Sequence, residues 1–327
     1  MRRIAAVAAV LAGLVLIATP IASSLFSRSK SAQQLADGVR TAMTKQALAA
    51  DRSSLELLRG ALSELNGPPR SRLARALGQS PQQFSASITS FPDVAAGLRE
   101  LPRGFVPHSG RVLSTLEQNR TRFETADDFP IGGVSARVGP WLFLALGVAL
   151  VAAGVAALLT RGRGALVAVL ALGLVPFVSG LALSLPHKAS ATDQLVDNLQ
   201  PAFSARTTGR VPGELATGQK FAHQTEAEFV PALEGTSGLS PEHFDAAVRG
   251  SAPHFAQALP RFTPIVANFT ALGTALVNDR HVFKEAAKIP SRTLVWLLLG
   301  ATFVVLVLAA AALVTETRRS PAAGGPA

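Results

Sequence analysis

The sequence predicts an all-α membrane protein with four transmembrane helices, built as a tandem, parallel repeat in which each repeat carries an exterior helical-bundle domain. Three observations lead to this fold class: four long uncharged apolar segments, an internal similarity at a constant offset of 160 positions, and helical spacing of apolar residues between the segments. The chain is 48% hydrophobic and only 16% charged, whereas soluble domains carry about 25% charged residues.

The four apolar segments each reach the roughly 20 residues that a helix needs to cross a bilayer. None of them contains Asp, Glu, Lys, Arg or His; they are residues 4–26 (the uncharged part of a first element at 1–26), 141–160, 165–185 and 294–315. Uninterrupted apolar runs of this length are typical of membrane spans. We therefore predict four transmembrane helices.

The first segment also resembles a secretory signal, because Arg2 and Arg3 precede an apolar stretch with a possible cleavage point near Ala22. The internal similarity favours a retained span instead. Gly13 aligns with Gly173 in the third segment, which lies in mid-chain and is not a signal. We expect residues 4–26 to remain in the mature protein.

Basic residues at the segment ends predict the orientation, since cytoplasmic loops are enriched in Lys and Arg. Six arginines lie on one side of the predicted spans: Arg2, Arg3, Arg161, Arg163, Arg318 and Arg319. Both termini are then cytoplasmic, with a disordered tail at 316–327, and residues 27–140 and 186–293 form two exterior domains. The location expected is a bacterial plasma membrane, crossed several times.

The internal repeat sets the architecture. At an offset of 160, Ser80-Pro81 and Phe84 align with Ser240-Pro241 and Phe244, and Phe123 aligns with Phe283. Because each repeat has an even number of spans, the two copies point the same way across the membrane. Phe84, Phe123, Phe244 and Phe283 are predicted to be buried at equivalent core positions.

Within the exterior segments the apolar residues recur at helical intervals, as in Leu55, Leu58, Leu62 and Leu65. We expect about four helices in each segment, divided at glycines and prolines. Ser80 and Ser240 have the position and residue type of helix N-caps, with proline at the first helical position. That capping chemistry explains these residues without a functional role.

The residue types present argue against an enzyme and against nucleic-acid binding. The high net charge of +10 comes from dispersed arginines with no interleaved aromatic platform, and Tyr is absent. No catalytic, cofactor-binding or metal-binding residue is predicted, because no motif for such chemistry occurs and Cys is absent. Five of the six histidines lie in the second repeat, where scattered solvated side chains are favoured over a metal or pH site; they are His187, His223, His243, His254 and His281.

The predicted cytoplasmic parts are too short to form a domain, so function is expected outside the membrane or within it. We expect a non-enzymatic envelope protein, an accessory or scaffold subunit whose exterior helical domains bind another envelope component. An alternative is a binding or transport-associated module for a lipid or apolar small molecule held between the two exterior bundles. The expected partners are membrane lipids and an envelope membrane protein or further copies of the chain, without a cofactor.

Overall fold

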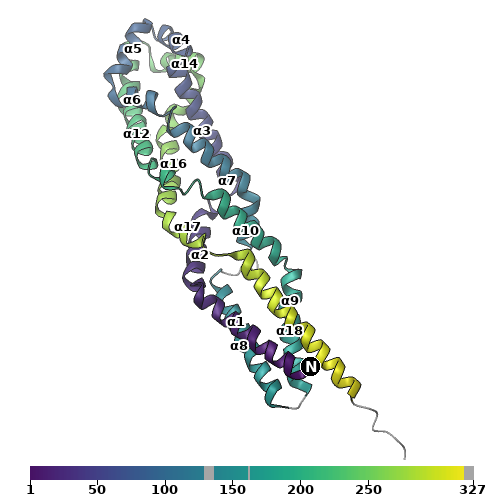
Figure 1. The fold of residues 1–327 in the computed structure, drawn as a ribbon. Helices are drawn as coiled ribbons and strands as arrows, with labels where there is room; N and C mark the ends of the chain where they lie inside the picture. The colour runs from purple at the N-terminus through teal and green to yellow at the C-terminus, as the bar shows by residue number, and fades with distance from the viewer. Residues whose placement is uncertain (129–135, 161–162, 320–327) are drawn as a thin grey trace, which may run out of the picture. The chain divides into compact units, whose positions relative to one another are not determined.

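The computed structural model describes residues 1–128, 136–160 and 163–319, and within these residues the secondary structure is helical with no strand (Figure 1). This confirms the all-α prediction. The chain divides into two compact units. The first unit comprises residues 1–37, 121–197 and 281–327, and the second comprises residues 38–120 and 198–280. Each unit therefore combines residues from both halves of the chain.

The first unit contains four helices long and apolar enough to cross a membrane, which confirms the four predicted spans. They are α1 (Arg2–Ala22), α8 (Val138–Leu159), α9 (Arg163–Ala182) and α18 (Ser291–Arg319). Helices α1 and α9 end before the predicted limits, because the chain turns at Ser24 (φ 52°) and Ser184 (φ 54°), both in the left-handed region. The predicted cytoplasmic Arg161 and residues 320–327 of the predicted tail lie outside the described residues.

These four helices pack as a bundle in which α1 lies along α8 and α18, and α9 lies along α18 and α8. Leu16, Leu150, Val169 and Val305 fill its centre and are fully buried. Glycines allow the closest approaches: a Cβ atom placed on Gly13 would come within 2.5 Å of the carbonyl oxygen of Gly147. Small residues are how membrane helices bring their backbones together.

Large apolar side chains also cover the outer surface of these helices. Leu11, Val175 and Val304 are about half exposed or more. Trp141 near the start of α8 and Trp296 near the start of α18 are 61% and 55% exposed, and tryptophan is enriched at membrane interfaces. An outer belt of this kind is suited to lipid, so the first unit is a membrane-embedded anchor.

The first unit also contains polar helical segments beyond the four apolar helices. These segments belong to α2 (Leu25–Arg40), α7 (Phe105–Asp127), α10 (Leu185–Leu199) and α17 (Arg280–Ala286). Two basic side chains make equivalent hydrogen bonds there, each to a backbone carbonyl oxygen. Arg28 donates to the carbonyl oxygen of Lys288 at 3.1 Å, and Lys188 donates to that of Asp128 at 3.0 Å. Phe123 and Phe283 are both buried here, as predicted.

The start of each returning apolar helix receives a hydrogen-bond acceptor from a polar helix. Gln33 of α2 accepts from the backbone N–H of Ala136 at 3.0 Å, just before α8. Asp193 of α10 accepts from the backbone N–H of Arg292 at 3.2 Å, at the start of α18. Asp193 satisfies an N–H group that the first turn of α18 leaves unpaired, and Gln33 fixes the backbone that leads into α8.

The second unit is a bundle of shorter helices. In chain order it contains α3 (Lys45–Asn66), α4 (Pro69–Ala76), α5 (Pro81–Ser90), α6 (Pro92–Glu100), residues 105–120 of α7, α11 (Ala205–Thr208), α12 (Val211–Gln224), the π-helix η1 (Thr225–Phe229), α13 (Val230–Ser237), α14 (Pro241–Ser251), α15 (Pro253–Ala258), the 3-10 helix η2 (Leu259–Arg261) and α16 (Phe262–Asn278). The expectation of about four helices per segment is therefore wrong. Prolines at the first helical positions of α4, α5, α6, α14 and α15 start new helices, since proline cannot continue the preceding hydrogen-bond ladder.

The helix N-caps predicted at Ser80 and Ser240 are present. Ser80 and Ser240 each accept a hydrogen bond from the third residue of the following helix, and Gln83 completes a capping box with Ser80. The predicted core residues Phe84 and Phe244 are 0% and 3% exposed. Gly78 and Gly238 precede these caps with φ of 70° and 67°, a backbone conformation that glycine adopts without strain.

Candidate functional site

Two buried polar side chains of the second unit cap helices that lie far away in the sequence. Glu64 of α3 accepts from the backbone N–H groups of His254 (3.2 Å) and Phe255 (2.8 Å), at the start of α15. Its carboxylate also lies 2.8 Å from Nδ1 of His254. A carboxylate in this position satisfies unpaired N–H groups, and its negative charge is stabilised by the positive end of the helix dipole.

Gln224 of α12 repeats this arrangement at α6. Its side-chain oxygen accepts from the backbone N–H groups of Asp93 at 2.8 Å and Val94 at 3.1 Å. Gln224 is 9% exposed and Glu64 is 8% exposed. Both side chains are thus engaged in holding the bundle together, which explains their burial without a ligand.

A third polar pair joins α7 to α12. Nδ1 of His108 lies 2.8 Å from Oε2 of Glu214, and both side chains are mostly buried. The pair borders a small cavity of about 30 Å³ with a largely apolar lining that includes Phe105, Leu215 and Phe269. That volume suits about one water molecule, so the cavity has no room for a lipid chain.

Glu214 also lines a second, open concavity with a volume of about 800 Å³. This depression, called the arginine hollow below, is lined by the end of α6, the segment that follows it and the start of α12. Its charged residues are Arg99, Glu100, Arg103, Arg210 and Glu214, and its glycines are Gly104, Gly209 and Gly213. All residues that line the arginine hollow belong to the second unit.

The histidines singled out from the sequence lie apart from this hollow and are exposed. His243 and His254 belong to separate helices, because the chain leaves helical geometry at Ala252 between them. His243 contacts Ser240 at 2.7 Å, at its own helix start. Over the described residues, no group of three or more His, Cys, Asp or Glu side chains is arranged to hold a metal ion.

The mostly buried pair of a histidine with a carboxylate is formed by His108 and Glu214. His108 is the one histidine of the first repeat and was not singled out from the sequence. Sequence reasoning missed it because its partner Glu214 is distant in the sequence and belongs to no motif. Burial raises the pKa of Asp51 and Asp279 above the usual range, and neither of them lines the arginine hollow. The pair and the hollow present no nucleophile activated by a neighbouring base.

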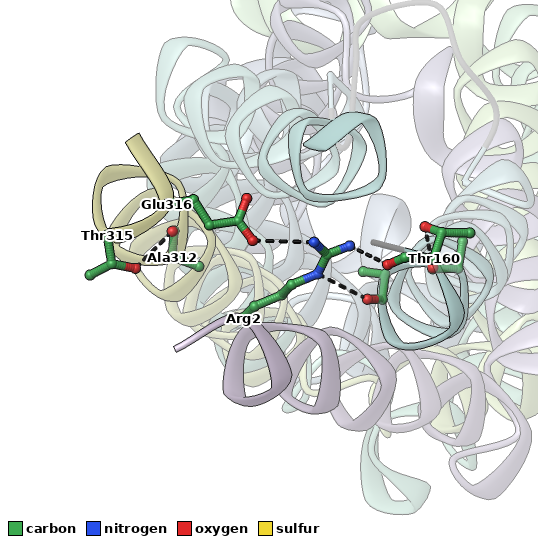
Figure 2. A network of polar contacts seen from close by, with 7 residues as sticks. Arg2, Thr160, Ala312, Thr315 and Glu316 are labelled. Carbon is green, nitrogen blue, oxygen red and sulfur yellow. Dashed lines mark hydrogen bonds and ion pairs between the residues drawn. The ribbon is translucent and has the colours of Figure 1, made fainter. Parts of the chain in front are cut away.

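A separate polar network ties three apolar helices together at one end of the anchor (Figure 2). Arg2 of α1 donates to the carbonyl oxygens of Ala157 (3.3 Å) and Thr160 at the end of α8, and forms an ion pair with Glu316 of α18 at 3.2 Å. Cations stabilise the unpaired carbonyl groups at a helix C-terminus. Through these contacts Arg2 holds the start of α1 to the ends of α8 and α18, which is a structural role.

Comparisons of this chain with protein-family models, with curated proteins and with solved structures find no match. The structural features that bear on function are a closely packed apolar anchor, a second unit held by reciprocal caps, and the arginine hollow.

Proposed function

We propose that this protein is a non-enzymatic integral membrane protein of the bacterial envelope, an accessory or scaffold subunit whose second unit binds another envelope component. One observation carries the proposal. Among the described residues, the exposed large apolar side chains all lie in the first unit, whereas the second unit has a polar surface with a charged hollow. The surface of the first unit is thus suited to contact lipid, and the surface of the second unit is suited to bind a partner in the aqueous phase.

We further propose that the chain is a tandem, parallel repeat. Support comes from features that recur at an offset of 160: the left-handed Ser24 and Ser184, and the crossed hydrogen bonds of Arg28 and Lys188. Glu64 and Gln224 have the same offset and cap each other's half of the chain. Each repeat would contribute two spans and half of the polar bundle. The two exterior segments would then form one joint bundle.

The proposed topology places residues 27–140 and 186–293 outside and both termini in the cytoplasm. The ion pair of Arg2 with Glu316 supports a shared side for the two termini, because it brings the start of α1 to the end of α18. A reporter fused after Arg319 should be active only in its cytoplasmic form, and one inserted at Gly67 only in its exported form. The opposite result at either position would reverse the topology.

The alternative of a lipid or apolar ligand receives less support from the geometry. The apolar cavity of the second unit holds about 30 Å³, whereas small-molecule sites occupy roughly 300–1,000 Å³. The larger hollow is lined by five charged residues. A hydrocarbon chain placed there would contact guanidinium and carboxylate groups rather than apolar side chains.

Purification from native membranes tests the scaffold function. A chain tagged after Arg319 should retain a protein partner in stoichiometric amounts after mild solubilisation and size-exclusion chromatography. A second copy of the chain as the sole partner would indicate a homo-oligomeric scaffold. A monomer that retains a lipid but no protein would contradict the scaffold and favour the alternative.

A further inference from the structure

We propose that the arginine hollow of the second unit receives an acidic peptide segment of the partner protein, with aspartate or glutamate side chains bound by Arg99, Arg103 and Arg210. This inference rests on the proposed scaffold function and deepens it, because it assigns the binding surface and the chemistry of the partner. Three observations support it: exposed arginines line the hollow, two glutamates lie beside them, and glycines leave its wall open.

The three arginines come from two separate parts of the chain and converge on one concavity. Arg99 lies in the last turn of α6, Arg103 follows that helix, and Arg210 precedes α12. All three side chains are exposed. In the described part of the chain, neither Arg103 nor Arg210 has an ion-pair partner. Arginine binds carboxylates through two parallel N–H donors, so the hollow offers unused donors for a carboxylate ligand.

The two glutamates distinguish a peptide from a densely charged anion. Glu214 is engaged by His108 at 2.8 Å, and Glu100 lies 3.5 Å from the hydroxyl of Thr217. Both carboxylates still line the hollow and repel a ligand composed only of phosphate groups. A peptide avoids this repulsion, because its acidic side chains meet the arginines while its backbone N–H groups can donate to the glutamates.

The walls leave room for a peptide backbone. Gly104, Gly209 and Gly213 line the hollow. A Cβ atom on Gly213 would meet nothing within 4 Å, so this wall is open, whereas one on Gly104 would come within 3.3 Å of Oε1 of Glu214. The volume of about 800 Å³ accommodates a few residues of an extended segment.

A binding measurement on the full chain tests the proposal. The protein would be placed in nanodiscs of neutral phosphatidylcholine, and the probe would be a fluorescein-labelled hexaglutamate peptide followed by anisotropy at about 0.1 M salt, where the Debye length is about 10 Å. The double variant Arg103→Ala/Arg210→Ala should weaken binding about tenfold or more, because the peptide carboxylates lose two charged, bidentate donors. Added salt should weaken binding to the wild-type protein.

The matched control is Arg75→Ala/Arg249→Ala. It removes the same charge from two exposed arginines of the second unit that lie outside the hollow. Its affinity should stay within about twofold of wild type, since distant exposed charges are screened. All four arginines are exposed, so both variants should keep the wild-type thermal unfolding temperature.

Three results would overturn the proposal: no peptide binding, equal loss in both variants, or tighter binding of inorganic phosphate or of vesicles containing phosphatidylglycerol through Arg103 and Arg210. Purification of Arg103→Ala/Arg210→Ala from native membranes separates this failure from failure of the scaffold function. A partner that still co-purifies with that variant would leave the scaffold intact and place its surface elsewhere.

Discussion

Replacing Phe84 by alanine is expected to lower the free energy of unfolding of the second unit by about 3–5 kcal/mol. The Phe84 side chain is 0% exposed, and its ring packs edge to face against Phe229 with the ring centroids 6.4 Å apart. Arg70 lies over the same ring at 6.0 Å. Truncation would leave a cavity that α5 cannot close without moving its N-terminal cap. Thermal unfolding followed by circular dichroism, in detergent, measures the loss.

Phe244→Ala should produce a loss of similar size, because Phe244 follows the equivalent cap in α14 and is 3% exposed. The control is Gln82→Ala, which removes an exposed side chain from α5 and should change stability by less than about 0.5 kcal/mol. Trp141 and Trp296 both lie in the first unit, so tryptophan fluorescence should respond less than circular dichroism. Losses below about 1 kcal/mol for both phenylalanines would show that these sites repack freely.

The features predictable from the sequence are those with a local cause. The spans follow from long uncharged runs, and the caps at Ser80 and Ser240 follow from a serine, a proline and the next two residues. The burial of Phe84 and Phe244 follows from their spacing after those caps. In each case the interacting groups lie within about one or two helical turns, so residue order alone contains the information.

The helix count failed because the prolines alone do not show which breaks the fold stabilises. Helices α6 and α15 begin at Pro92 and Pro253, but their first N–H groups are satisfied by Gln224 and Glu64, which come from the other half of the chain. The repeat comparison also missed this pair, since Glu and Gln differ in type although both accept hydrogen bonds from backbone N–H groups. Only the folded arrangement reveals their common role.

The candidate site was unpredictable for a related reason. Arg99 and Arg103 are separated from Arg210 by about a third of the chain, and each alone has the pattern of a solvated surface arginine. His108 likewise gains its partner Glu214 only because α7 and α12 pack together. Convergence of side chains from distant segments leaves no periodic or motif signal in one sequence.

Replacing Gly13 or Gly147 by alanine is expected to destabilise the anchor by about 1–3 kcal/mol at each position. A Cβ atom on Gly13 would lie 2.5 Å from the carbonyl oxygen of Gly147, and one on Gly147 would lie 2.7 Å from that of Gly13. Side-chain atoms of Val151 and Ile17 also obstruct these sites, but rotating them away would leave the backbone oxygens in place, so α1 must separate from α8. Trp141 is on α8, so tryptophan fluorescence during thermal unfolding in detergent should report the loss.

Gly300 supplies the matched control for these variants, because a Cβ atom there would meet nothing within 4 Å. Gly300→Ala should be neutral or stabilising by up to about 1 kcal/mol, since alanine favours a helix more than glycine does. The double variant Gly13→Ala/Gly147→Ala should lose less than the sum of the two single losses, because the first methyl group already forces the helices apart. If Gly13→Ala were as mild as Gly300→Ala, or if the two losses were fully additive, close backbone contact between α1 and α8 would not hold the anchor together.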